Sequence, residues 1–101
     1  MKYDLEISPL VIKERLKLLI NQVYKLLPMR EEGTDWEKPL STIMEELSGM
    51  SRLLENQQQN FFVLLSKMEG LFTLTNQNDF LLYRRTIFEC LGLLNLIFKN
   101  V

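Results

Sequence analysis

The sequence predicts an all-α protein, a compact bundle of four helices within a single domain of residues 1–101. Three observations lead to this fold class. Apolar residues recur at steps of three and four along most of the chain, which is the period of one face of an α-helix. The alternation of apolar and polar residues that is typical of a half-buried strand is absent. Short polar segments separate the apolar stretches, and such segments usually connect elements.

The first helix is expected over about residues 9–27. Ser8 can cap the first N–H groups with its side-chain oxygen, and Pro9 fits the first helical position because its missing N–H would have no partner there. An apolar stripe follows at helical spacing: Ile12, Leu16, Leu19, Val23 and Leu26. Pro28 cannot donate the next backbone hydrogen bond, so we expect the helix to end near Leu27.

The stretch LLPMREEGTDW, residues 26–36, is expected to form the corner between the first two helices. Gly33 supplies a turn. Thr34 and Glu37 have the spacing of a capping box, and Asp35 is the alternative cap. We therefore interpret the proline, glycine and charges of this stretch first as a helix connection.

A second helix is expected over about residues 35–55 and a third over about residues 60–75. Their apolar stripes are Trp36, Leu40, Ile43, Leu47, Met50 and Leu54, then Phe61, Leu65, Met68 and Phe72. The polar segment ENQQQN, residues 55–60, separates them, and Asn60 can cap the third helix. However, a heptad pattern continues through the segment: Met50, Leu54, Gln57, Phe61, Leu64, Met68 and Leu71. The alternative is thus one fused helix of about 40 residues, roughly 60 Å long, which would imply a dimer.

The fourth helix is expected over about residues 79–99, where Asn78 or Asp79 can act as the cap. Its main stripe is Phe80, Tyr83, Ile87, Leu91, Leu94 and Phe98, and further leucine and isoleucine residues occupy its other faces. A helix that is apolar around most of its circumference lies at the centre of a bundle or is covered by a second chain. Because the net charge of −1 gives little repulsion between copies, we expect a homodimer.

Composition and charge narrow the classes of function. Hydrophobic residues make up 47% of the chain and charged residues 25%, which favours a compact soluble protein over a disordered one. The longest apolar-rich segment, residues 86–98, is too short to span a bilayer, and the opening MKYDLEISP lacks the pattern of a signal peptide. Cys90 is the only cysteine, and we expect a buried, reduced thiol in a cytoplasmic protein.

The chain has no histidine, which excludes Ser-His-Asp and Cys-His catalysis and most zinc sites. No glycine-rich phosphate loop is present either. Helical nucleotide pyrophosphohydrolases hold magnesium with clustered acids. Their acids follow the pattern EExxE. Glu45 and Glu46 match its first two positions, but Gly49 stands where the third acid is needed. We expect no catalytic residue, cofactor, metal or small-molecule substrate. A magnesium-dependent nucleotide hydrolase is the function that the sequence favours least.

Three residues are candidate contacts for a protein partner: Arg30, Trp36 and Phe62. Tryptophan and arginine are typical of interaction hot spots, although Trp36 also fits the apolar register of the second helix and is interpreted first as a core residue. Phe62 follows Phe61, and adjacent residues point about 100° apart on a helix, so one of the two rings should face outward.

Basic residues are the candidates for nucleic-acid contact: Lys13, Lys17, Arg84 and Arg85. Lys13 and Lys17 lie one helical turn apart. Such surfaces usually combine more positive charge with interleaved aromatic residues, whereas the aromatic residues here follow the apolar stripes. Residues 9–27 carry a net charge of +3 and residues 28–59 a net charge of −4. We therefore expect the basic first helix to pair with the acidic second helix.

The segments VYKLLPMREEGTDWEKPLSTIMEELSGM, residues 23–50, and RRTIFECLGLLN, residues 84–95, resemble small uncharacterised helical proteins of Gram-positive bacteria and of their phages and mobile elements. The resemblance implies a bacterial cytoplasm and an accessory role, for which phage-encoded inhibitors of host enzymes are one precedent. We therefore expect a non-catalytic helical protein that acts through protein–protein interaction or self-association. The alternative is a nucleic-acid-binding accessory protein.

Overall fold

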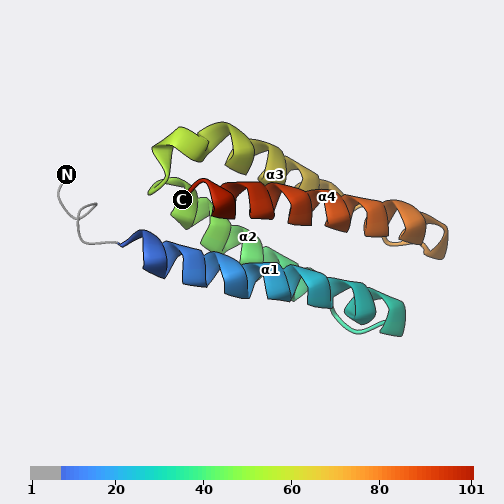
Figure 1. The fold of residues 1–101 in the computed structure, drawn as a ribbon. Helices are drawn as coiled ribbons and strands as arrows, with labels where there is room; N and C mark the ends of the chain where they lie inside the picture. The colour runs from blue at the N-terminus through green and yellow to red at the C-terminus, as the bar shows by residue number, and fades with distance from the viewer. Residues whose placement is uncertain (1–7) are drawn as a thin grey trace.

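The computed structural model describes residues 8–101 and shows an all-α four-helix bundle (Figure 1). Its helices are α1 (Pro9–Glu32), α2 (Glu37–Ser51), α3 (Gln58–Leu71) and α4 (Phe80–Lys99), and short 3-10 turns, η2 (Glu55–Gln57) and η3 (Gln77–Asp79), precede α3 and α4. The bundle measures 48 × 22 × 19 Å. The expected lack of a signal peptide concerns the first nine residues, of which 1–7 lie outside the described residues.

Successive helices run in opposite directions, and α4 packs against both α1 and α3 (Figure 1). Helix α2 closes the ring between α1 and α3. One apolar stripe from each helix forms the core, and α4 contributes six buried side chains, more than any other helix. The fourth helix is apolar on several sides in part because it packs against two neighbours, α1 and α3.

The prediction that Pro28 ends the first helix is wrong, because α1 continues to Glu32. A proline inside a helix costs about 3 kcal/mol through the lost hydrogen bond and the ring's steric clash. Here the turn beyond it is held in place, because Met29 packs against the core and the Arg30 side chain bonds to a distant loop. Gly33, with φ of 77°, then ends the helix: its N–H donates to the Arg30 carbonyl, and the next N–H donates to that of Met29.

The second helix begins at Glu37 rather than at about residue 35, and the expected capping box of Thr34 is wrong. The Asp35 side chain is the cap, because its Oδ1 accepts the N–H groups of Glu37 and Lys38 at 3.1 and 3.2 Å. The Thr34 hydroxyl instead donates back to the Met29 carbonyl at 3.0 Å. The reversal of the chain after Gly33 turns Thr34 toward the end of α1, which leaves the cap to its neighbour.

The break between the second and third helices is confirmed, and the fused helix is not formed. Leu54, with φ of −121° and ψ of 71°, leaves the helical region, so α2 ends at Ser51. The buried Gln57 accepts a hydrogen bond from the Asn60 side chain at 2.8 Å. Helix α3 begins at Gln58, so Asn60 lies in its first turn rather than capping it.

Two further details of α3 differ from expectation. The buried stripe is Phe61, Leu64, Met68 and Leu71, which is the stripe of the heptad pattern, whereas Leu65 and Phe72 are only half-buried. The helix also ends at Leu71 rather than near residue 75. The following residues turn to place the Leu74 carbonyl against the Arg30 side chain. Helix α4 begins at Phe80, within one residue of the expected start, but the expected cap by the Asp79 side chain is not formed. The Asp79 carboxylate instead accepts the Asn76 N–H at 3.4 Å.

None of the helices in residues 8–101 has the length and the apolar character needed to cross a membrane.

Candidate functional site

Two of the candidate partner contacts, Arg30 and Trp36, meet at one end of the bundle. The Arg30 guanidinium donates to the backbone carbonyls of Leu74 and Asn76, at distances of 2.7–3.0 Å. It also lies over the Tyr83 ring, with 4.8 Å between Cζ and the ring centroid. This side chain therefore joins the end of α1 to the loop that precedes α4.

Trp36 lies beside this contact and is only 8% exposed. Its ring stacks on Phe72 at 6.2 Å and meets the edge of Tyr83 at 4.9 Å. Trp36 therefore belongs to the core, and the stretch LLPMREEGTDW forms a packed corner between α1 and α2, as expected. Both side chains thus make extensive contacts within the chain.

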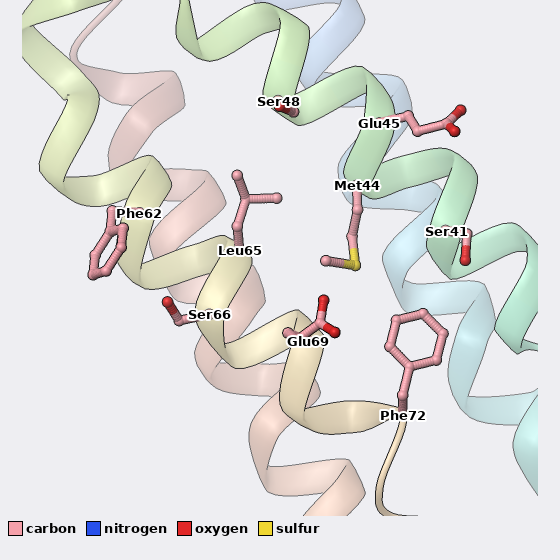
Figure 2. A pocket seen from close by; sticks show the side chains of 9 residues that line it. All are labelled: Ser41, Met44, Glu45, Ser48, Phe62, Leu65, Ser66, Glu69 and Phe72. Atoms are coloured by element: carbon pink, nitrogen blue, oxygen red, sulfur yellow. The ribbon is translucent and has the colours of Figure 1, made fainter.

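Phe62, the third candidate, has a different environment. It is 68% exposed on α3 and lies at the edge of an open groove between α2 and α3, with a volume of about 810 Å³. Figure 2 shows Met44 of α2 and Leu65 of α3 pointing into this groove, while the Phe72 ring closes one end. We call this feature the α2–α3 groove, and its apolar floor consists of Met44, Leu65 and Phe72.

The walls and rim of the α2–α3 groove are small or acidic. Ser41, Ser48 and Ser66 line its sides, and Glu45 and Glu69 are the only charged residues in its lining within the described part of the chain. In Figure 2 the Glu69 side chain points into the groove, whereas Glu45 points outward along α2. Neither carboxylate takes part in an ion pair within residues 8–101. The spacing of Ser41, Met44 and Ser48 on one side of the second helix is the sequence signal that could have indicated this surface.

A second exposed apolar surface follows the outer side of α4, opposite its buried stripe. Leu81, Phe88 and Leu96 are 76%, 44% and 43% exposed. Arg85 and Gly92 lie between them at helical spacing, and both are exposed. We call these five residues the α4 face. Helical spacing places apolar residues on several sides of the fourth helix, but it does not show which of them the neighbouring helices leave uncovered.

The candidate nucleic-acid contacts do not gather in one place. The Lys13 ammonium lies 4.6 Å from the centroid of the Phe98 ring, near the end of α4. Arg84 lies 14 positions earlier on α4, about 21 Å along the helix axis. Lys17 and Arg85 are exposed, and Arg85 points about 100° away from Arg84.

Around Arg84, however, the structure differs from the expectation that aromatic residues stay apart from basic ones. The Arg84 guanidinium lies 5.3 Å from the centroid of the Phe88 ring. Phe88 in turn meets the edge of Tyr24 of α1 at 6.4 Å, and both rings are about half-exposed. Packing of α1 against α4 brings Tyr24 to this site, which spacing within one helix cannot reveal.

We expected the basic first helix to pair with the acidic second helix. Between α1 and α2 the structure shows one ion pair, which joins Arg15 to Glu46. A second pair joins Lys67 of α3 to Glu89 of α4 at 3.0 Å. Within residues 8–101, no three acidic, cysteine or histidine side chains lie close enough together to hold a metal ion. Cys90 is buried, as expected, and desolvation raises the pKa of its thiol to about 12.

Comparison of the chain with protein-family models, with curated proteins and with solved structures finds no match to any of them.

Proposed function

We propose that this protein is a non-catalytic protein that acts through protein–protein contact and forms a homodimer through the α4 face. The observation that carries the proposal is the row of exposed apolar side chains on the outer side of α4, at Leu81, Phe88 and Leu96. The resemblance to small proteins of Gram-positive bacteria and their phages adds the proposal of an accessory or inhibitor role in the cytoplasm.

The positions on the α4 face suit an antiparallel pair of identical helices. Leu81 and Leu96 are equally far from the midpoint of the row, and so are Arg85 and Gly92. In a two-fold pair, Leu81 of one copy therefore lies opposite Leu96 of the other, and Arg85 lies opposite Gly92. A Cβ atom added at Gly92 would meet no side chain of residues 8–101 within 4 Å. The space beside Gly92 is therefore open to the long arginine side chain of a second copy.

The size of this surface predicts a weak dimer. Covering the exposed part of one leucine or phenylalanine side chain contributes on the order of 1 kcal/mol. A two-fold contact covers each of the three side chains twice. The sum of about 6 kcal/mol corresponds to a dissociation constant of roughly tens of micromolar before the cost of association is subtracted. We therefore expect monomers and dimers in reversible equilibrium only at high micromolar concentrations or above.

Sedimentation equilibrium of the wild-type chain tests this proposal. A concentration-dependent rise from the monomer mass toward twice that mass is expected. The double substitution Leu81→Lys and Leu96→Lys should abolish the rise, because it places four charges in the two-fold contact. Phe62→Lys is the matched control, since Phe62 is 68% exposed but lies on the α2–α3 groove. A wild-type chain that stays monomeric at high micromolar concentration would remove the dimer.

The second candidate function is nucleic-acid binding, and the cluster of Arg84, Phe88 and Tyr24 favours it. An exposed aromatic ring beside an arginine can stack on a base while the charge contacts phosphate. Binding to random single-stranded DNA or RNA should then weaken with salt and with Arg84→Glu. Charge reversal at Lys13 and Lys17 tests whether the basic side of α1 takes part. Lack of binding at low salt would end this candidate.

A further inference from the structure

We propose that the α2–α3 groove binds a basic amphipathic helix of another protein, whose apolar side chains enter the groove while its lysine or arginine residues flank it. This inference rests on the proposed function in assigning the protein a role in protein contact. It concerns a different surface from the α4 face and a different partner.

The shape of the groove fits a helix. Its wall on α2 runs from Ser41 to Ser48, about 10 Å along the axis, and its wall on α3 from Phe62 to Phe72, about 15 Å. These lengths match two to three turns of a helix, which present apolar anchors at i, i+4 and i+7. The serine side chains are small enough to let a backbone approach, and Met44 on the floor can adapt its shape to such anchors.

The charge of the groove selects the kind of helix. Among residues 8–101, Glu45 and Glu69 are the only charged residues that line it, and no lysine or arginine does. Within residues 8–101, basic side chains form ion pairs with Glu46 and Glu89, but with neither of these two carboxylates. An acidic or neutral helix would leave both uncompensated at the contact, and like charges there are repelled. A helix with basic flanks supplies the missing partners.

Direct binding of designed peptides tests the inference. The probe is a fluorescein-labelled helix of about 16 residues with leucine at i, i+4 and i+7 and lysine at the flanking positions. A matched peptide carries glutamate in place of lysine, and a third carries alanine in place of leucine. Fluorescence anisotropy should show the basic peptide binding at least tenfold more tightly than either of the others.

Charge exchange in the protein sharpens the test. In the double variant Glu45→Lys and Glu69→Lys the preference should invert, so that the acidic peptide binds more tightly than the basic one. The matched control is Glu31→Lys and Glu32→Lys, which changes the net charge equally at exposed positions at the end of α1. That control should keep the preference of the wild type. Ser48→Trp fills the groove without a change of charge and should weaken the basic peptide at least tenfold.

Amide chemical-shift mapping shows where the peptide binds, and the expected changes lie along residues 41–48 and 62–72. Equal affinity for the basic and acidic peptides, an unchanged preference in the Glu45→Lys and Glu69→Lys variant, or mapping to α4 would each overturn the inference. Loss of self-association in that variant would assign the groove to a second copy instead, which also overturns it. The Leu81→Lys and Leu96→Lys variant should bind the basic peptide as the wild type does, so failure of the dimer and failure of the groove are measured separately.

Discussion

Arg30 donates hydrogen bonds from Nε and Nη2 to the backbone carbonyl oxygen of Leu74, at 3.0 and 2.7 Å, across 44 positions of sequence. This contact joins the end of α1, beyond Pro28, to the loop between α3 and α4. It therefore ties the last turn of α1 to that loop. The corner at LLPMREEGTDW and the loop at residues 72–79 form one end of the bundle because of it.

Replacement of Arg30 should therefore destabilise the whole fold. Arg30→Ala removes charged hydrogen bonds to two carbonyls and the contact with the Tyr83 ring, so we expect a loss of about 2 kcal/mol in the free energy of unfolding. Arg30→Lys should lose about half as much, because an ammonium cannot reproduce the planar fork. Urea denaturation measures both. Arg52→Ala, at an exposed position, should stay within about 0.5 kcal/mol of the wild type; a similar loss at both arginines would contradict this role.

Tyr83→Phe should make the protein more stable. The Tyr83 hydroxyl is buried and has no hydrogen-bond partner among residues 8–101. A buried polar group without a partner costs about 1–3 kcal/mol, and phenylalanine keeps the ring contacts with Trp36 and Arg30. We expect a gain of about 1 kcal/mol in thermal or urea unfolding, and little change for Tyr24→Phe, whose hydroxyl is on a half-exposed ring. A loss of stability in Tyr83→Phe would show that the hydroxyl has a partner in solution.

Two glycine substitutions should have opposite signs. Gly49→Ala adds a methyl group that would meet no atom of residues 8–101 within 4 Å beyond its own helix backbone and chain neighbours. We therefore expect a gain of about 0.5 kcal/mol from the higher helix propensity of alanine. Gly33→Ala also meets no steric contact, but φ of 77° there disfavours any L side chain, so we expect a loss of about 1 kcal/mol. Equal effects in urea denaturation would contradict the left-handed end of α1.

Alkaline pH should destabilise the fold in part through Cys90. Burial raises the pKa of its thiol from 9.0 to about 12, so above pH 9 the unfolded chain releases this proton while the folded chain retains it. The free energy of unfolding should then fall between about pH 9 and pH 12, by up to about 1.4 kcal/mol per pH unit from this group. Burial also raises the pKa of Tyr83, which acts in the same direction. Cys90→Ala should show a shallower pH dependence; an unchanged slope would assign the effect to other groups.

A charge placed on the inner side of α4 should prevent folding, and the same charge on its outer side should not. Leu91 is buried, and Leu91→Asp is expected to cost about 4 kcal/mol or more. Leu96→Asp is the matched control on the same helix, where the position is half-exposed. Lys17→Ala, at an exposed position of α1, should also leave the fold intact. Far-UV circular dichroism of the three variants distinguishes these outcomes, and a folded Leu91→Asp chain would contradict the packing of α4.

Helix order and most of the core could be predicted from spacing, because a stripe of apolar residues must face inward wherever a helix forms. The stripe of α1, from Ile12 to Leu26, is buried as expected. For α3 two stripes were compatible with the sequence, since Phe61 and Met68 belong to both. The positions of α2 and α4 decided between them: Leu64 and Leu71 face the core, and Leu65 and Phe72 line the groove.

The candidate sites were less predictable for the same reason. Trp36 and Phe62 are both aromatic residues on helical stripes or next to them, yet one is buried against Tyr83 and Phe72 and the other is exposed. Exposure depends on which neighbouring helix covers a position, and spacing within a single helix carries no information about its neighbours. Likewise, the hydrogen bond from Arg30 to the Leu74 carbonyl joins positions 44 residues apart, which spacing along the chain cannot predict.

By itself, the sequence determined that this chain forms four helices and where each of them begins, to within about two residues. Because the chain has no histidine, the sequence also excluded histidine-based catalysis. These properties are local, since they follow from residue type and from the period of the helix. Only the tertiary structure decided that α1 continues through Pro28, which side of α3 is buried, and which apolar side chains stay exposed on α4. These properties depend on contacts between residues far apart in sequence, whose energies outweigh local preferences of a few kcal/mol.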